Sequence, residues 1–159
     1  MNDGKSFVAL AQTLGTQTTS KAAMRSAVSR AYYGAYNYAR HVLRQLGYSR
    51  IANGRSHGDV WNYFQNSGDV NAVNAGQMLA DLDAARVSAD YHLNKSQYEG
   101  QKNVQWSIAT AHSILNEFDN CLATSAKRVT VAQGMGKYEQ VLRGGAPTPP
   151  TSQSQGNHI

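Results

Sequence analysis

Two residues whose side chains can act on a phosphate ester, Arg86 and His92, stand close together in the run Arg86-Val-Ser-Ala-Asp-Tyr-His92. A guanidinium can hold a phosphate through a bidentate, permanently charged contact, and an imidazole can move a proton near neutral pH. Together the two groups could cut RNA without a metal ion. The alternative is structural, because Asp90 stands four residues after Arg86, the spacing of an ordinary ion pair within a helix.

The spacing also predicts that one straight helix holds these two side chains apart. At about 100° per residue, six steps place Arg86 and His92 roughly 120° apart, on opposite sides of an apolar stripe that carries Leu82 and Ala89. A joint site therefore requires that the helix ends near Tyr91 or that a partner chain completes the site. Otherwise a histidine near a helix C-terminus only interacts favourably with the helix dipole.

A stretch without acids lies between residues 21 and 58 and favours a polyanionic partner, with solvation of a helix surface as the alternative. Its seven cations are Lys21, Arg25, Arg30, Arg40, Arg44, Arg50 and Arg55. Steps of three and four place part of this stretch on one helix face, namely Arg30, Tyr33, Asn37, Arg40 and Arg44. Such a face could follow an RNA backbone and stack a base, or form a polar interface with another helix.

Composition limits the class of protein. The chain has 159 residues, of which 41% are apolar and 16% charged, which fits one soluble domain. The absence of both a long apolar run and a signal-peptide pattern predicts a cytoplasmic protein without a membrane partner. The single cysteine, Cys121, excludes an internal disulfide and a multi-cysteine zinc site, and we expect it to be buried. No histidine stands at metal-ligand spacing, so we expect neither a metal nor another cofactor.

Apolar periodicity predicts an all-α fold, an antiparallel bundle of four or five helices. The expected helices cover residues 5–14, about 20–46, a short segment through 60–64, and 70–93. Apolar residues recur at steps of three and four from Met24 to Leu46 and predict one buried stripe on the second helix, and Ser56 is the expected cap of the short one. A last long helix starts near 103 and has an apolar seam that reaches Val129. Gly134 and Gly136 are expected to interrupt it before a short helix at 137–142. We expect one domain over residues 1–143 and a flexible C-terminal tail over 144–159, which is rich in proline, serine and glutamine.

Three motifs resemble those of a known family. The run from Ser26 to Tyr36, Ser-Ala-Val-Ser-Arg-Ala-Tyr-Tyr-Gly-Ala-Tyr, resembles the SRAYYAAF signature of the HEPN superfamily (higher eukaryotes and prokaryotes nucleotide-binding domain). The run from Arg86 to Tyr91 resembles the R-x-x-A-D-Y motif of the same branch. His57, before a short amphipathic helix, matches a histidine commonly found between the two. Their order and spacing agree over about residues 20–95.

The resemblance implies a helical bundle that dimerises, and many members are metal-independent endoribonucleases in toxin–antitoxin, CRISPR-associated or other phage-defence systems. Their R-x4–6-H site would make Arg86 the group that binds the scissile phosphate and His92 the general base or acid. The products would be a 2′,3′-cyclic phosphate and a 5′-hydroxyl. We therefore predict a homodimeric ribonuclease that acts on RNA in such a defence or toxin system, with His57, Asp90 and Tyr91 in supporting roles.

A non-catalytic module is the alternative to the ribonuclease. Catalytic members usually carry a polar residue directly after the arginine, where this chain has Val87. Asp90 could neutralise Arg86 or pair with Arg30, which would make the motif structural. The same branch includes chains that act as binding or regulatory partners of small nucleotidyltransferases. Such a module would bind RNA, a nucleotide or a protein partner, and a purely structural subunit of a larger assembly is a third reading.

Overall fold

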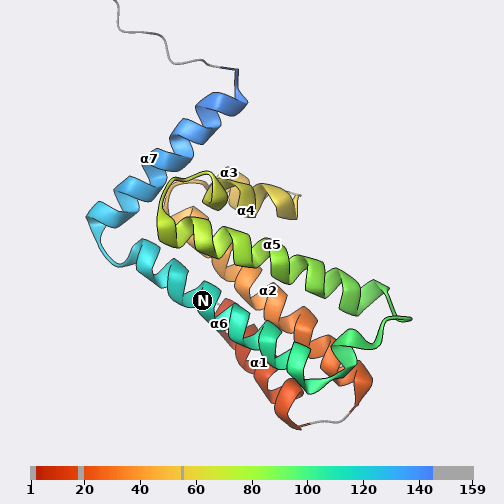
Figure 1. Cartoon of the computed structure of the whole chain (residues 1–159). Helices are drawn as coiled ribbons and strands as arrows, with labels where there is room; N and C mark the ends of the chain where they lie inside the picture. Colours follow the sequence, from red (N-terminus) through yellow and green to blue (C-terminus); the bar gives the residue numbers. More distant parts are fainter. Residues whose placement is uncertain (1–2, 18–19, 55, 145–159) are drawn as a thin grey trace, which may run out of the picture.

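The computed structural model describes residues 3–17, 20–54 and 56–144, and within them it is built from helices without a β-strand. Figure 1 shows their order: α1 (Asp3–Gln17), α2 (Lys21–Gln45), α3 (Ser49–Ala52), α4 (His57–Gln65), α5 (Val70–Tyr91), the 3-10 helix η1 (Ser96–Glu99), α6 (Gln101–Leu122) and α7 (Ser125–Leu142). The predicted all-α bundle is confirmed.

Polar side chains set the start of four of the helices. A side-chain oxygen accepts a hydrogen bond from a main-chain N–H in the first turn of α2, α4, α5 and α7. Such caps satisfy donors that a helix terminus leaves open. The capping residues are Ser20, Ser56, Asp69 and Thr124.

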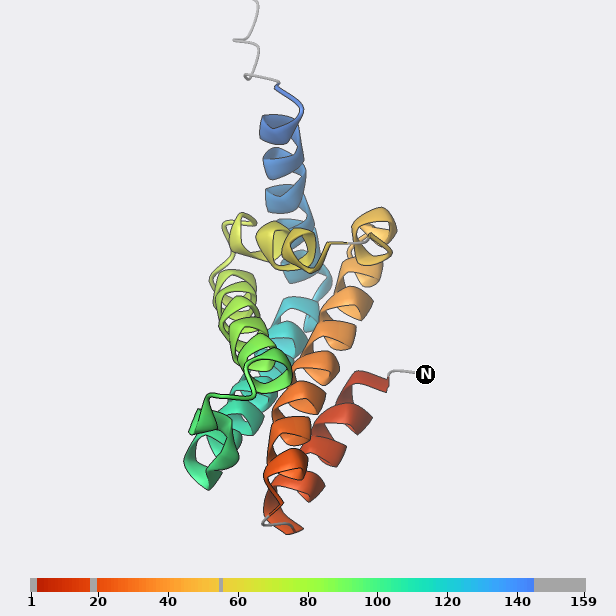
Figure 2. The ribbon, with the colours of Figure 1, turned by 90° about the vertical axis from the view of Figure 1, so that its right-hand side faces the viewer.

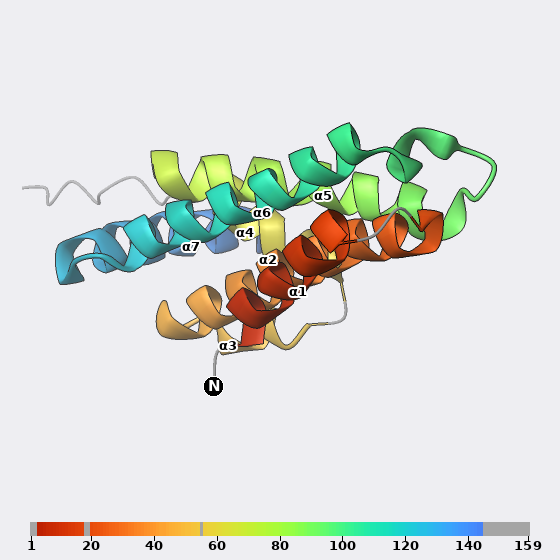
Figure 3. The ribbon, with the colours of Figure 1, turned by 90° about the horizontal axis from the view of Figure 1, so that it is seen from below.

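Helices α1, α2, α5 and α6 form the body of the bundle (Figure 3), and α3 and α4 lie across one end of it (Figure 2). The direction of α5 relative to α2 follows from one contact: Arg25, in the second turn of α2, reaches the main-chain oxygen of Ala89 near the end of α5. The two helices are therefore antiparallel. This arrangement places the SRAYY-like motif of α2 directly against the R-x-x-A-D-Y-like motif of α5.

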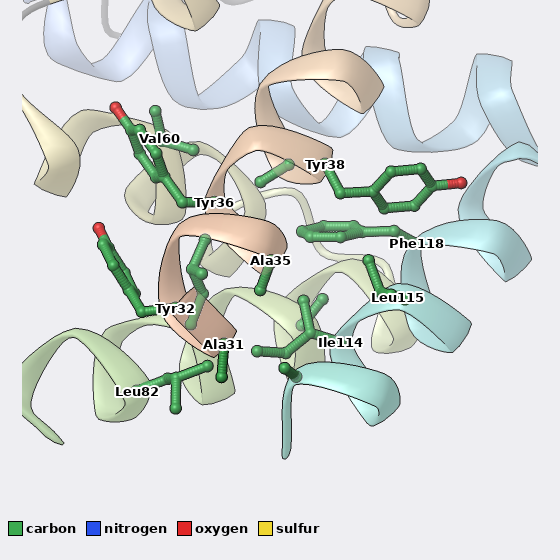
Figure 4. Packing of buried hydrophobic residues seen from close by; sticks show 14 of the residues in the cluster. Ala31, Tyr32, Ala35, Tyr36, Tyr38, Val60, Leu82, Ile114, Leu115 and Phe118 are labelled. Carbon is green, nitrogen blue, oxygen red and sulfur yellow. The ribbon is translucent and has the colours of Figure 1, made fainter. Parts of the chain in front are cut away.

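The apolar stripe predicted on α2 forms the centre of the core, and its seven residues are all buried: Met24, Val28, Ala31, Ala35, Tyr38, Val42 and Leu46. Figure 4 shows the small side chain of Ala31 between Leu82 of α5 and Ile114 of α6, with Ala35 one turn further along α2. On the side of α1, a Cβ at Gly34 would lie 2.6 Å from a methyl carbon of Val8. Small residues thus let three helices approach α2 closely.

The last part of the chain differs from the prediction. The expected long helix ends at Leu122, and Thr124 caps a separate helix, α7. Val129 is 54% exposed, so the predicted seam does not extend that far. Helix α7 continues through both glycines, and a Cβ at Gly134 would lie 1.6 Å from the main-chain oxygen of Ser67. This close approach to the α4–α5 loop explains the glycine, which was predicted to break a helix.

Helix α7 leaves the bundle and extends past α3 and α4 (Figures 1 and 2). Short helices α3 and η1 were not predicted, and α1 continues beyond its predicted end at residue 14. Of the predicted tail, residues 145–159 lie outside the described residues, as does Arg55 of the cationic stretch. None of the described helices is both long and apolar enough to cross a membrane.

Candidate functional site

Arg86, the predicted phosphate-binding residue, is buried between α5 and α2, with 8% of its surface exposed. Its Nη2 donates a hydrogen bond to Oδ1 of Asp83 at 2.6 Å. Its guanidinium carbon lies 5.2 Å from the ring centre of Tyr32 and 5.7 Å from that of Tyr33. Burial by itself would lower the pKa of Arg86, but the hydrogen bond and the charge of Asp83 raise it above its usual range. The guanidinium is therefore a fixed cation, balanced by a carboxylate of its own helix.

The carboxylate partner of Arg86 differs from the expected one. Long side chains on a helix project towards its N-terminus, so Arg86 reaches back to Asp83 more readily than forward to Asp90. Asp90 instead accepts a hydrogen bond from Oγ of Ser29 at 3.1 Å. Arg30, the other expected partner of Asp90, lies over an aromatic ring of α1. The expected ion pairs of Asp90 are thus wrong, and this residue joins α5 to α2 by a hydrogen bond.

His92, the predicted proton-transfer residue, lies just beyond α5 as its C-cap, with φ −103° and ψ 67°. Its side chain is exposed, and Tyr91 beside it is 70% exposed. Arg86 points into the α2–α5 contact, and in the described part of the chain no hydrogen bond or ring contact joins it to His92. One chain therefore does not assemble the R-x5-H pair as a joint site.

Arg25, from α2, holds the turn that carries His92. It forms a short ion pair with Glu99 of η1, at 2.9 Å, and only 9% of its side chain is exposed. It also donates to main-chain oxygens at the end of α5, where the helix leaves its own carbonyls without partners. Those oxygens belong to Ala89, His92, Leu93 and Lys95. Although Arg25 is part of the predicted cationic stretch, its role is structural.

His57 begins α4 and lies against the aromatic residues of α2. Its ring centre is 4.4 Å from that of Tyr36, and its Nδ1 is 2.7 Å from the hydroxyl of Tyr32. The same nitrogen lies 3.8 Å from Oδ1 of Asp83, the carboxylate that holds Arg86. Burial, followed by the charge of Asp83, raises the pKa of Tyr32 far above its usual range, so this phenol stays protonated. We call these groups the polar cluster: Tyr32, Tyr33, Tyr36, His57, Asp83 and Arg86.

Three arginines of α2 form a second group, which we call the arginine row: Arg30, Arg40 and Arg44. None of the three has a carboxylate partner among the described residues, whereas Lys21, Arg25 and Arg50 each pair with a glutamate. Arg30 and Arg44 are exposed and Arg40 is half-buried. Helical geometry places them within an arc of about 80° and along about 21 Å of the helix.

The arginine row and the polar cluster meet at two aromatic rings. The guanidinium of Arg40 lies 5.8 Å from the ring centre of Tyr36, which also stacks on His57 and Tyr32. Tyr33, half-buried, contacts the His57 ring edge to face at 6.4 Å. The two groups therefore form one continuous surface from α2 to the start of α4. This surface combines cations that have no carboxylate partner in the described residues, aromatic rings and one titratable imidazole; Arg40 and Arg44 donate hydrogen bonds to the Ala52 oxygen and to Oδ1 of Asn53.

Sequence reasoning missed Asp83 and Glu99, the acids that hold the two buried arginines. The first was detectable, because it stands three residues before Arg86, on the side towards which a helical arginine points. The second lies 74 positions from Arg25 in the chain, and no local spacing reveals such a pair. Among residues 3–17, 20–54 and 56–144, no three His, Cys, Asp or Glu side chains gather as metal ligands.

Comparison with known proteins gives this chain no relative. It matches no protein-family model, no curated protein and no solved structure. The surface described above therefore stands on its own geometry.

Proposed function

We propose that this chain is a HEPN-like helical module that binds single-stranded RNA along α2 without cutting it. The observation that carries the proposal is the arginine row, three cations on one helix face that have no carboxylate partner within the described residues. The resemblance of the α2 and α5 motifs to the SRAYY branch of HEPN proteins supports the same class.

The chemistry of the row suits a polyanion. Phosphates bind to cations that are not already neutralised, and each contact releases counterions. The row is long enough for several nucleotides, and Tyr33 lies on the same face with a ring that can stack on a base. Asp83, an acid of the neighbouring polar cluster, is already paired with Arg86. It therefore repels a phosphate less than a free carboxylate would.

The state of Arg86 and His92 favours binding over cleavage. A phosphate that approached Arg86 would have to displace Asp83 from a 2.6 Å ion pair in a buried position. His92 is exposed at the far end of the motif, and its main chain is fixed by Arg25. Neither residue is positioned to act on one phosphate together with the other inside one chain.

The second candidate is the metal-independent ribonuclease, in which a homodimer would join His92 of one chain to Arg86 of the other. The exposed side chains of Tyr91 and Leu93, each 70% exposed beside His92, give a partner chain a surface to contact. The setting that we propose for either form is a cytoplasmic toxin–antitoxin or antiviral defence system, with a further protein partner from that system.

One experiment separates the two candidates. End-labelled oligouridine is incubated with the purified protein in EDTA, and both bound and cut RNA are measured. We expect bound, intact RNA, and an affinity that falls about tenfold in the double variant Arg30→Ala/Arg44→Ala. The matched control, Lys102→Ala/Lys137→Ala, removes the same charge from α6 and α7 and should change affinity less than about twofold.

The opposite outcome is equally specific. Cleavage in EDTA that disappears in His92→Ala, whose exposed side chain can be removed without harm to the fold, would establish the ribonuclease. Equal losses of affinity in the two double variants would instead reduce RNA binding to a nonspecific effect of net charge.

A further inference from the structure

The imidazole of His57 has one edge that is engaged and one that is not. Its Nδ1 faces the Tyr32 hydroxyl at 2.7 Å. No hydrogen bond within the described residues uses its Nε2, and 33% of the side chain is exposed. The residue is held in place by the stacked ring of Tyr36 at 4.4 Å. His57 is thus a fixed imidazole with a free outer nitrogen.

The Tyr32 hydroxyl can accommodate either protonation state of this imidazole, because the carboxylate of Asp83 lies near enough to raise the pKa of this phenol and offers a second acceptor for its proton. With neutral His57, the phenol donates to Nδ1 and the outer Nε2 carries the proton. With protonated His57, Nδ1 donates to the phenol oxygen, and the phenol turns its proton towards Asp83. The carboxylate, 3.8 Å from Nδ1, then balances part of the new charge. Gaining a proton therefore costs the cluster no hydrogen bond at Nδ1.

His57 also lies beside the arginine row. The ring of Tyr36 contacts both groups: its centre is 4.4 Å from that of the imidazole and 5.8 Å from the guanidinium carbon of Arg40. A protonated imidazole here adds a fourth cation to a surface that already has three without carboxylate partners. The titratable and charged groups that face it come from α2, α4 and α5: Tyr32, Tyr33, Tyr36, Arg40, Asp59, Asp83 and Arg86.

We propose that His57 is a proton-dependent RNA contact, whose Nε2 donates to a phosphate of a strand bound along the arginine row. This inference rests on the proposed RNA binding and adds a regulatory property to the same site. Affinity for RNA rises as the pH falls through the range in which histidine gains a proton. The inference concerns binding alone and requires no cleavage step.

The test measures the affinity of the whole chain for a ten-residue oligouridine by filter binding at pH 8.0, 6.5 and 5.5, at constant ionic strength. Neither uracil nor a phosphodiester titrates in this range, so the charge of an oligouridine without a terminal phosphate is the same at all three pH values. We expect the wild type to bind about five- to tenfold more tightly at pH 5.5 than at pH 8.0. His57→Gln, which keeps a donor without a titratable group, should show less than about a twofold change. His92→Gln and His112→Gln are the matched controls and should respond like the wild type.

A second measurement on the unaltered protein protects the result from a folding defect in the variant. The His57 ring resonance is titrated by NMR with and without saturating oligouridine, and RNA should raise the pKa of this imidazole, because a ligand that prefers the protonated form stabilises it. An unchanged titration, or a full pH response in folded His57→Gln, overturns the inference while RNA binding stands. If the wild type binds no RNA at any of these pH values, the proposed function fails first and the inference with it.

Discussion

The buried and the exposed arginines of this bundle differ in what neutralises them. Arg25 and Arg86 lie inside the contact between α2 and α5, and each is held by a carboxylate, that of Glu99 or Asp83. The arginine row lies on the outer face of α2 and has no such partner among the described residues. Cations of the first kind stabilise the fold, and those of the second kind have no carboxylate that an anionic ligand would have to displace, although Arg40 and Arg44 donate hydrogen bonds to Ala52 and Asn53.

The contrast shows that charge in the sequence and charge available to a ligand are different quantities. The acid-free stretch of α2 looks uniform along the chain. Yet Arg25 donates its hydrogen bonds to the end of α5, whereas Arg30, five residues later, only lies over an aromatic ring of α1. The same holds for the R-x5-H run, in which Arg86 is buried and His92 is exposed.

The largest effect is expected for Arg25→Ala. This change removes the buried arginine donor from four main-chain oxygens and from the carboxylate of Glu99, so unfolding should become easier by about 3–5 kcal/mol. Urea denaturation measures the loss, and hydrogen exchange should accelerate over residues 92–99. Lys21→Ala, which also removes a partner of Glu99 but from an exposed position, is the control and should stay within about 0.5 kcal/mol. Similar losses in both variants would contradict the structural role of Arg25.

A somewhat smaller effect is expected for Arg86→Ala, about 2–4 kcal/mol, because it strands the mostly buried Asp83 carboxylate and removes packing on two tyrosine rings. His92→Ala, at the exposed end of the same motif, should cost less than about 0.5 kcal/mol. The two variants are compared in one series of thermal and urea denaturation experiments. Equal losses of unfolding free energy in the two variants would mean that Arg86 and His92 contribute to stability alike, which would contradict a structural role for Arg86 alone.

The pH dependence of stability should report the Arg25–Glu99 pair. Hydrogen bonds from Arg25 and then Lys21 hold the pKa of the Glu99 carboxyl below its usual value. A lowered pKa in the folded state contributes stability that is complete above the pKa of the unfolded chain, about 4.3. That contribution is lost as the pH falls from there through the folded pKa. In Glu99→Gln, the free energy of unfolding, measured by urea denaturation at each pH, should fall less steeply over this acidic range. The same decrease as in the wild type would contradict the prediction.

The smallest effect on stability is expected at the arginine row. Arg30→Ala and Arg44→Ala remove exposed side chains without carboxylate partners in the described structure, so each should change the free energy of unfolding by less than about 0.5 kcal/mol. Denaturation under the conditions of the RNA assay checks this. A loss above about 1 kcal/mol would place these residues with the structural arginines.

Much of the fold could be predicted because apolar periodicity and caps are local signals. The α2 stripe from Met24 to Leu46 and the Ser56 cap both stand where the sequence indicates. The break at Thr124 was missed because the apolar spacing continues across it, and Gly134 was misread because its reason is contact with Ser67, a segment far away in the chain. Local patterns do not carry such tertiary contacts.

The candidate site was predictable only in part, for the same reason. The face of Arg30, Arg40 and Arg44 follows from helical spacing, but the lack of a carboxylate ion pair for any of the three within the described residues does not. The sequence indicated His57 only through a family resemblance. The structure shows that its ring stacks on Tyr36 and that its Nδ1 lies beside the Tyr32 hydroxyl. A short motif such as R-x5-H gives the residue types of a site without the environment that decides their use.

The salt dependence of RNA binding tests the central claim most directly. Affinity for oligouridine is measured from low to physiological salt for the wild type, Arg30→Ala/Arg44→Ala and Lys102→Ala/Lys137→Ala. If the arginine row holds the phosphates, log affinity against log salt should become shallower by about 1.4 in the first variant, roughly 0.7 for each lost contact, and stay unchanged in the second. Equal slopes for all three proteins would contradict an RNA-binding face on α2.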